Sequence, residues 1–332
     1  MWSWLMAVSL AAPAKPVLDR PAAVNIPVQN VANGFPATDL PAVVAIGAMT
    51  QDGYYGAFCS GTVISGRWVL TAAHCVDAIE ELEADEDEDY DFVVLFGDDV
   101  YQSLEDYIEI TEWVVHPDYV NNTGVVGAPV LTFADIAVLR LASNADPDPM
   151  PLYDQSVTPW HDRELRYSGF GVTNNDPEAE VDGLKRYADI PYAGFYDDLI
   201  FGYDPEQNIC HGDSGGAALV DEGGGWRLAG VNSFGGACPG GENAAVRVDR
   251  YLPWLDSLEI PYVTESGGEN AGAEATLVVD VYDGWAPAVD GTEPVTMDGS
   301  KGLDSGCQQA GGWPGWAGVG LLGLARRRRH QH

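Results

Sequence analysis

The chain has 332 residues, 46% of them hydrophobic, so it can bury a large core as one large or two ordinary domains with tails. Its 51 acidic and 16 basic residues give a formal net charge of −35. Such an acidic molecule repels phosphate backbones and anionic membrane surfaces, which excludes nucleic acid as an expected partner.

The beginning of the chain is a short apolar run that ends in an Ala-x-Ala-like sequence, Ala12–Ala14. This pattern predicts a signal peptide over residues 1–14, and therefore export. No Lys or Arg precedes the apolar run, so a simple apolar N-terminal arm stays open as the alternative.

Residues 31–260 contain many short β-branched or aromatic runs separated by Gly, Pro, Asn and Asp. Evenly spaced short strands with turn signals predict an all-β barrel or sandwich. Only Asp249–Ile260 has the apolar spacing of a helix, and Pro253 is compatible with that helix if it lies in the first turn.

An acidic run, Glu80–Asp91, interrupts this pattern. Because its charges repel one another, the run predicts a solvated loop between two strands. A structural calcium loop is the alternative, since close carboxylates suit a hard cation, although no fixed ligand spacing is visible.

The C-terminal part changes composition. Residues 261–306 are acidic and Gly-rich, which predicts a linker. Residues 307–332 begin at Cys307, continue through the apolar segment Gly311–Ala325 and end in the cluster Arg326–Arg329. The apolar segment is shorter than the roughly 20 residues that a membrane-spanning helix needs, which makes permanent anchoring by this segment alone unexpected.

Three motifs place chemically complementary side chains at the edges of predicted strands. The sequence RWVLTAAHC carries His74, FADIAVLRL carries Asp135, and CHGDSGG carries Ser214. A serine needs a base to take its proton and a third group to orient that base. In this chain order, the three residues can supply the base, the orienting group and the nucleophile.

The segments TAAHC, DIAVLRL and GDSGG resemble the three catalytic motifs of the trypsin/chymotrypsin family of serine proteases, and the likeness covers about residues 31–260. Three motifs in the family's order form a specific signal, whereas one alone is weak. The resemblance implies an all-β fold of two packed six-stranded antiparallel barrels and a C-terminal helix. The N-barrel would span about residues 31–145 and the C-barrel about residues 146–260.

The resemblance also implies roles for the motif residues. Ser214 would attack the scissile carbonyl, His74 would take and return the proton, and a buried Asp135 would orient the imidazole. The N–H groups of Gly212 and Ser214 would form the oxyanion hole. His211 adjoins this turn, and whether it contacts substrate stays open.

The five cysteines form no CxxC pair and no cluster with His at zinc-finger spacing, so no metal site is expected. The resemblance implies the disulfides Cys59–Cys75, next to the histidine, and Cys210–Cys238, at the specificity pocket. Cys307 is left over. Disulfides fit an exported protein. No cofactor is expected, apart from the calcium alternative above.

Asp213 matches the family residue that forms an ion pair with a new N-terminus after zymogen cleavage. The resemblance makes Val31 that terminus and residues 15–30 a propeptide. Asn30 stands where the family usually has Arg or Lys, so cleavage is expected from an activating protease of a different specificity.

The resemblance places three residues around the specificity pocket. Asn208 would form the floor, Gly235 would leave one wall open, and Asn243 would line the back. Since an Asp at the floor would pair with Lys or Arg, Asn208 predicts a preference for neutral side chains instead of strict cleavage after Lys or Arg.

The tail resembles the three-part C-terminal sorting tails of Gram-negative bacteria, including myxobacterial and GlyGly-type tails. Cys307 would be its cleavage or lipid-attachment point, with an incidental free cysteine as the alternative. The expected location is therefore secreted or on the cell surface of a Gram-negative bacterium, with transient membrane association through the tail.

Together, these features predict an exported, zymogen-type serine endopeptidase, a hydrolase of protein or peptide substrates that works through an acyl-enzyme. A non-catalytic surface-binding protein on the same scaffold is the main alternative. An esterase using the same triad is the third, because acyl chemistry on esters and amides shares its groups.

Overall fold

The computed structural model describes residues 34–264, apart from 51–52, 85–88, 103–105, 122–131, 158–159, 161–162, 175 and 177–178. The predicted signal peptide, propeptide and tail lie outside the described residues, as do Val31, Cys307 and the predicted linker beyond Thr264. The first residues of that linker, 261–264, belong to the fold: Tyr262 is buried, and the N–H of Leu152 donates to the carbonyl oxygen of Val263 at 2.7 Å. Within the described part of the chain, no helix is long and apolar enough to cross a membrane.

The first barrel is closed by six antiparallel strands in the order β2-β3-β4-β9-β6-β5. The strands are β2 (Val43–Thr50), β3 (Gly53–Ser65), β4 (Trp68–Thr71), β5 (Asp91–Leu95), β6 (Tyr107–Val115) and β9 (Ala137–Leu141). In β2, the whole run Val43–Ile46 is buried, which is why its sequence is continuously apolar instead of alternating.

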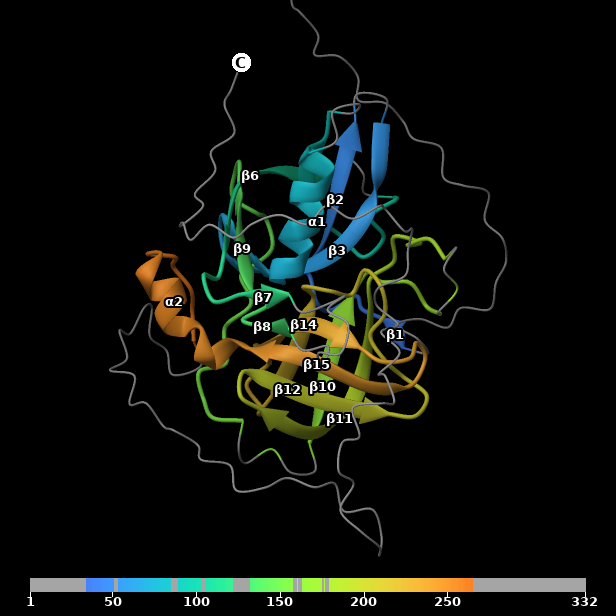
Figure 1. Ribbon diagram of the computed structural model, residues 1–332, viewed down its shortest axis with the longest axis vertical. Coiled ribbons are helices and arrows are strands. Elements are labelled where there is room, and N and C mark those ends of the chain that lie inside the picture. Colours follow the sequence, from blue (N-terminus) through green and yellow to red (C-terminus); the bar gives the residue numbers. More distant parts are fainter. Residues whose placement is uncertain are drawn as a thin grey trace, which may run out of the picture.

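The second barrel has the strand order β11-β10-β13-β14-β15-β12, and β11 also pairs with β12, which joins the two ends. The strands are β10 (Glu164–Gly169), β11 (Arg186–Tyr196), β12 (Leu199–Asp204), β13 (Ala217–Asp221), β14 (Trp226–Gly235) and β15 (Gly241–Arg247). The predicted fold of two six-stranded antiparallel barrels is therefore confirmed. Figure 1 shows the barrels one above the other.

The first strand departs from the predicted division into barrels. In β1 (Phe35–Pro36), Phe35 lies opposite Tyr187 and Pro36 opposite Arg186 of β11. The beginning of the predicted N-barrel, about residues 31–145, thus extends the sheet of the second barrel. The segment that follows Val31 in sequence is anchored on that barrel.

The acidic run is not entirely a loop, so this prediction is wrong for its first residues. The helix α1 (Ala73–Glu83) includes Glu80–Glu83. It buries Cys75, Val76 and Ile79, which recur at helical spacing. The acidic side chains of its last turn are exposed to solvent. Their density favoured a loop in the sequence-based prediction, although the apolar residues of the same segment have helical spacing.

The predicted C-terminal helix over Asp249–Ile260 is shorter than expected. A 3-10 turn, η1 (Val248–Arg250), precedes α2 (Leu252–Ser257), and Pro253 lies in the first turn of α2. Two short strands, β7 (Val120–Asn121) and β8 (Thr132–Phe133), pair with each other in a separate two-stranded sheet.

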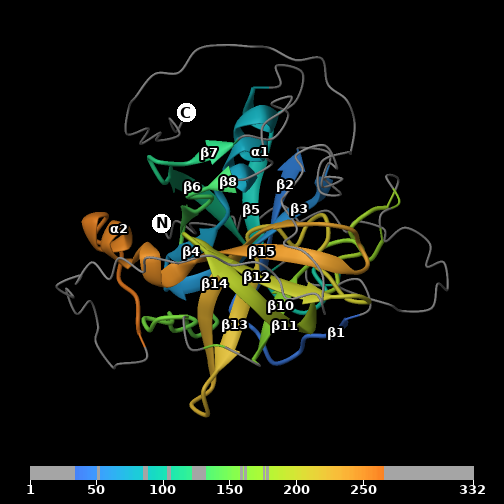
Figure 2. The same cartoon turned by 60° about the horizontal axis from the view of Figure 1, so that its bottom comes forward.

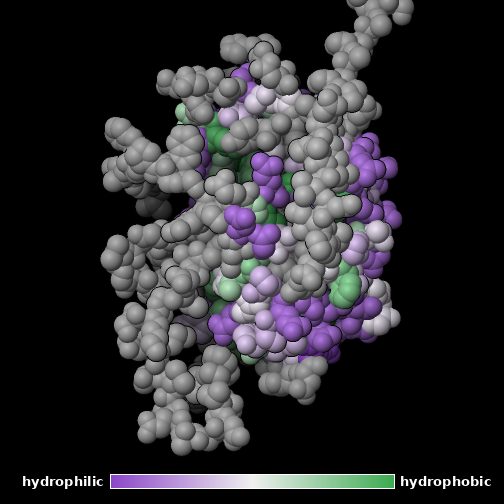
Figure 3. Space-filling view, turned by 90° about the vertical axis from the view of Figure 1, so that its right-hand side faces the viewer, coloured by the Kyte–Doolittle hydropathy of each residue, from purple (hydrophilic) through white to green (hydrophobic). Residues whose placement is uncertain are grey.

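The views in Figures 1 and 2 place α2 at the side of the molecule, and in Figure 2 the turn between β13 and β14 extends from the bottom. On the face in Figure 3, the described surface of the lower barrel is mostly hydrophilic.

Candidate active site

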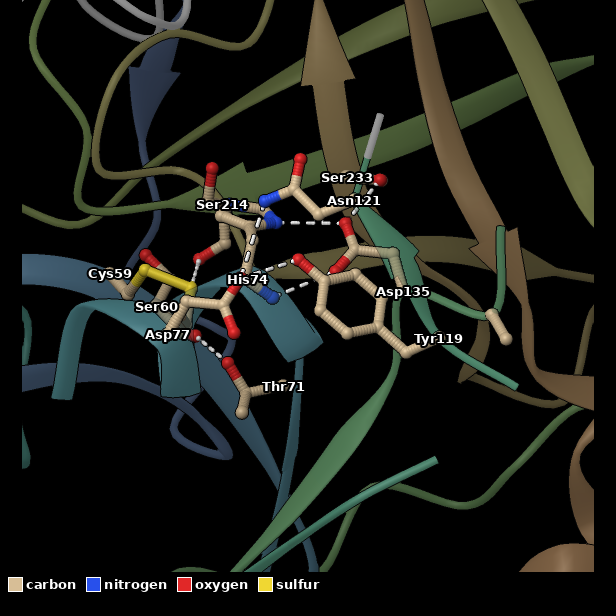
Figure 4. A network of polar contacts seen from close by, with 12 residues as sticks. Cys59, Ser60, Thr71, His74, Asp77, Tyr119, Asn121, Asp135, Ser214 and Ser233 are labelled. Atoms are coloured by element: carbon tan, nitrogen blue, oxygen red, sulfur yellow. Dashed lines mark hydrogen bonds and ion pairs between the residues drawn. A yellow bond between two sulfur atoms is a disulfide. The ribbon is translucent and has the colours of Figure 1, made fainter. Parts of the chain in front are cut away.

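His74 and Asp135 form a directly bonded pair. His74 is the second residue of α1, which begins shortly after β4 ends at Thr71, and Asp135 lies between β8 and β9. The main-chain N–H of His74 donates to Asp135 Oδ1 at 2.9 Å, and His74 Nδ1 lies 2.8 Å from Asp135 Oδ2. With Nδ1–H donating to the carboxylate, Nε2 is left free to accept a proton. Figure 4 shows this pair within its network.

The surroundings of the pair set its electrostatics. Burial opposes protonation of His74, but the charge and hydrogen bond of Asp135, together with the charge of Asp77, outweigh it and raise the pKa of His74 above 6.5. Burial also acts to raise the pKa of Asp135, yet His74 and the Ser233 hydroxyl, which donates at 2.5 Å, lower it overall. Asp135, which is fully buried, therefore stays ionised and holds the imidazole.

Ser214 lies in the turn before β13, and this turn packs against the segment that carries His74. The N–H of Ser60, on β3, donates to the Ser214 carbonyl oxygen at 2.8 Å. The same carbonyl oxygen is 3.5 Å from Sγ of Cys75, the residue after His74. Although Ser214 belongs to the second barrel and His74 to the first, the fold thus brings the two segments together.

The turn before Ser214 has a backbone that requires glycine. Gly212 has φ +91°, and a Cβ there would lie 3.0 Å from the Cα of Gly171. The hydroxyl of Ser60 donates to the Gly212 carbonyl oxygen at 2.7 Å, which fixes this peptide. Within the described residues, the N–H groups of Gly212 and Ser214 donate no hydrogen bond, so both remain available to a ligand.

Asp213 is fully buried beneath this turn. Its carboxylate accepts hydrogen bonds from the N–H groups of Gly171 and Cys210, each at 2.8 Å. Burial raises the pKa of Asp213 to about 6, and the two N–H donors and the charge of Arg186 offset only part of that effect. A buried carboxylate of this kind is stabilised by a nearby cation.

Both predicted disulfides, Cys59–Cys75 and Cys210–Cys238, are present. The first ties β3 to α1 next to His74, and the second ties the turn before Ser214 to the loop after β14. His74 has a ring nitrogen close to the sulfurs of Cys59 and Cys75, the three ligand atoms all lying within 4.8 Å of one another. These sulfurs are bonded to each other, so they offer no thiolate to a metal.

The three predicted pocket residues also come together. Asn208 Nδ2 donates to the carbonyl oxygen of Ala237 at 2.9 Å, and Asn208 Oδ1 accepts from Asn243 Nδ2 at 3.1 Å. Gly235 adjoins them, since a Cβ there would lie 3.1 Å from the carbonyl oxygen and 3.2 Å from Cγ1 of Ile209. Asn208 and Asn243 are both buried, so the hydrogen-bonded pair of amides is uncharged and shielded from solvent.

Sequence reasoning missed several residues of this network. Ser60 donates to the Gly212 carbonyl oxygen, and Ser233 donates to the Asp135 carboxylate. Tyr119 donates to Asp77 at 2.8 Å. Ser233 lies in the same NSFGG segment as Gly235, separated from it by Phe234, and the segment was the only available signal for it. His211 is half-buried, and its carbonyl oxygen accepts from the N–H of Val172 at 2.7 Å. This hydrogen bond involves only the main chain, so it does not test whether the ring contacts substrate.

A half-buried histidine bonded to a buried aspartate thus lies beside a GDSGG turn, and the sequence that forms this arrangement matches a known family. The sequence profile described as Trypsin matches residues 33–255. The chain belongs to the trypsin family of serine proteases. This trypsin-family chain is 29% identical over 219 residues to Brachyurin of Leptuca pugilator, a match that covers 60% of this chain and 87% of that protein.

A second relative is CLIP domain-containing serine protease B14 of Anopheles gambiae, which is 25% identical over 243 residues. That match covers 60% of this chain and 63% of the relative. The chain spans only 13% of Ovochymase from Halocynthia roretzi. Some trypsin-family relatives therefore contain considerably more chain than the part that is shared.

A solved structure shares the fold. It is titled neuropsin, a serine protease expressed in the limbic system of mouse brain, and the TM-score is 0.52 with 22% sequence identity. The match covers 68% of this chain and 98% of the neuropsin chain. At this level of identity, the likeness supports the trypsin fold and no further property.

Proposed function

We propose that this chain is a serine endopeptidase in which Ser214, His74 and Asp135 form the catalytic triad. The observation that carries the proposal is the bond of 2.8 Å between His74 Nδ1 and the buried Asp135, with the Ser214 turn packed against the same segment. This arrangement leaves one imidazole nitrogen as a base beside a serine.

In the first half of the reaction, Ser214 Oγ attacks the carbonyl carbon of the substrate while its proton moves to His74 Nε2. The π electrons of the carbonyl move onto its oxygen, where the free N–H groups of Gly212 and Ser214 stabilise them. The carbon–nitrogen bond then breaks, and the proton on His74 passes to the leaving amine. Losing one such oxyanion donor costs about 2.7–4 kcal/mol of barrier.

In the second half, a water molecule takes the place of the amine. His74 removes a proton from the water, whose oxygen attacks the acyl carbon, and the bond from that carbon to Ser214 Oγ breaks as the proton returns to the serine. Asp135 stays ionised throughout and stabilises the imidazolium that forms in each half.

The proposal is tested with a denatured protein substrate and the processed enzyme. Wild type should release new peptide termini, which mass spectrometry identifies, and Ser214→Ala should release none above background. Ser257→Ala is the matched control, because this exposed serine on α2 donates only to its own helix and should leave the rate unchanged. Equal peptide release by wild type and Ser214→Ala would contradict the proposal.

The proposed substrate preference is for neutral side chains at the position before the cleaved bond. Asn208 carries no charge, and its Nδ2 group is already surrounded by the carbonyl oxygens of Ala237, Gly240 and Glu242. A peptide library should therefore be cut mainly after neutral residues, whereas Asn208→Asp should increase cleavage after Lys and Arg. A wild type that cuts only after Lys or Arg would contradict this preference.

Activation by cleavage before Val31 is also part of the proposal. Support comes from the buried carboxylate of Asp213, which has no ion-pair partner among the described residues, and from β1, which anchors residues 35–36 on the second barrel. A new α-amino group could supply the cation that Asp213 lacks among the described residues. N-terminal sequencing of active enzyme should begin at Val31, and a different first residue would reject this site.

Export and C-terminal sorting complete the proposal. The two disulfides support export to an oxidising compartment, while the Ala12–Ala14 sequence, Cys307 and the cluster Arg326–Arg329 support processing at both ends. We expect a mature form on the surface or outside a Gram-negative cell. Mass spectrometry of the released protein should show that Arg329 has been removed, and a mature form that retains it would oppose processing.

A further inference from the structure

Asp198 is a buried carboxylate that lies away from the residues assigned above. It occupies the tight turn between β11 and β12 in the second barrel and is only 6% exposed. The N–H of Arg247, on β15, donates to the main-chain carbonyl oxygen of Asp198 at 2.7 Å. The main chain of Asp198 is therefore fixed to the neighbouring strand, which limits the positions that its side chain can take.

The carboxylate of Asp198 reaches the first barrel. Its Oδ2 atom accepts hydrogen bonds from the N–H of Ala134 at 2.8 Å and from the hydroxyl of Tyr251 at 2.5 Å. Its Oδ1 atom is buried and has no hydrogen-bond partner within the described residues. Burying a polar side chain with one unsatisfied oxygen costs free energy, so we ask what the two hydrogen bonds of Asp198 contribute.

The residue that Asp198 holds is the one directly before Asp135. Ala134 has φ +50°, a left-handed conformation that is costly for any residue with a Cβ and that needs support from its surroundings. On the other side of Asp135, the carbonyl oxygen of Ile136 accepts from the N–H of His116 at 3.1 Å. Asp135 thus lies between two peptides that are each fixed by a residue outside the turn.

The two supports are connected to each other. The ring of His116 packs edge-on against Tyr251, with ring centroids 4.9 Å apart, and Tyr251 also bonds Asp198. Tyr251 follows η1, so the C-terminal segment closes the cluster of Asp198, Tyr251 and His116 behind the turn. Among the described residues, the hydrogen bonds of Asp198 and Tyr251 in this cluster lead to Ala134 and to each other, so the cluster reaches the site through the turn that carries Asp135.

We propose that Asp198 is a positioning residue for the Asp135–His74 pair: it holds the strained turn at Ala134 across the barrel interface so that the Asp135 carboxylate faces His74. The proposal rests on the proposed function. A displacement of a catalytic group by about 1 Å costs about 100-fold in rate, so the support of this turn has a direct effect on turnover.

The test compares Asp198→Ala with Asp198→Asn, whose amide oxygen can still accept from Ala134. A fluorophosphonate titration first counts competent sites, so that kcat is expressed per active enzyme and unfolded protein is left out. We expect Asp198→Ala to lower kcat about 10- to 100-fold with KM within about twofold, and Asp198→Asn to recover most of that loss. If Asp198→Ala yields too little enzyme, Asp198→Ser, which is too short to reach Ala134, carries the same comparison.

Asp256→Ala is the matched control, because Asp256 accepts a hydrogen bond from Tyr262 at 2.8 Å but holds no part of the Asp135 turn. Its kcat should equal that of wild type. The NMR signal of the proton between His74 and Asp135 should also shift in Asp198→Ala and stay in place in Asp256→Ala. An unchanged kcat per titrated site in Asp198→Ala, or an equal loss in Asp198→Asn, would overturn the proposal. Wild type that is not titrated at Ser214 would instead reject the proposed function.

Discussion

Replacing Asp135 with asparagine tests the role of the buried carboxylate, because the two side chains have the same shape. In wild type, Asp135 Oδ2 faces His74 Nδ1 at 2.8 Å and Oδ1 accepts the His74 N–H at 2.9 Å. If the amide oxygen of the new side chain keeps the main-chain bond, its NH₂ group faces Nδ1. That nitrogen must then become the acceptor, which moves the imidazole proton to Nε2 and leaves no base beside Ser214.

The opposite amide orientation is no better. It places an NH₂ group against the N–H of His74, and a buried donor left without an acceptor costs about 1–3 kcal/mol. Both orientations also lose the negative charge that stabilises the imidazolium. We therefore expect kcat to fall on the order of 10⁴-fold, which corresponds to about 5.4 kcal/mol of activation free energy.

The assay is the hydrolysis of a chromogenic peptide substrate between pH 5 and 10, normalised to folded enzyme by circular dichroism. In wild type, kcat/KM should rise with pH through a pKa above 6.5, because the proposed mechanism uses the neutral form of His74 as the base. Ser233→Ala is the control: it removes one hydrogen bond but keeps the carboxylate, so its loss should be about 10- to 100-fold. A folded Asp135→Asn enzyme whose kcat lies within tenfold of wild type would refute the reasoning.

Three further predictions concern the support of the site. The folded-state pKa of Asp213, about 6, lies above the ordinary value of 3.8, so its favourable contribution is present below pH 3.8 and is lost as pH rises through 6. In urea unfolding of the uncleaved protein, the free energy of unfolding should fall by about 3 kcal/mol across that pH window, and in Asp213→Asn this fall should be absent. If the free energy of unfolding changes with pH in the same way in both proteins, the assignment is contradicted. Removing the Cys210–Cys238 disulfide, with a sequence separation of 28, should lower the free energy of unfolding by about 3.6 kcal/mol, and a change below about 1 kcal/mol would argue against a structural role. Gly215→Ala would place a Cβ 2.1 Å from Oγ1 of Thr71, whereas Gly223→Ala, also at positive φ, meets nothing within 4 Å. The first should therefore be about 1–3 kcal/mol more destabilising by thermal unfolding, and equal effects would show that the Ser214 turn has room to move.

The three motifs that carry His74, Asp135 and Ser214 could be found in the sequence because each is a short local pattern in which neighbouring residues mark one position. Ser60, Ser233 and Asp198 were not, because their contacts join positions 152, 98 and 64 residues apart, respectively. A serine or aspartate in a strand or turn has no local signal for such a partner. Only the packing of the two barrels brings these donors and acceptors together.

The differences in secondary structure have a similar cause. Cys75, Val76 and Ile79 carry the buried face of α1, but a high density of acidic residues in its last turn favoured a loop. Burial of the apolar face against the first barrel outweighs that local preference. For β1, the sequence Phe35–Pro36 is too short to reveal a strand, and its pairing with β11 depends on the second barrel.

The most direct measurement of the central claim is the covalent labelling of the processed enzyme with an active-site serine phosphonate, followed by peptide mapping. The account predicts a single adduct on Ser214 and no adduct in Ser214→Ala. His74→Ala should be labelled far more slowly, because it has no base to take the serine proton. Wild type that is folded, correctly cleaved and still unlabelled at Ser214 would contradict the account.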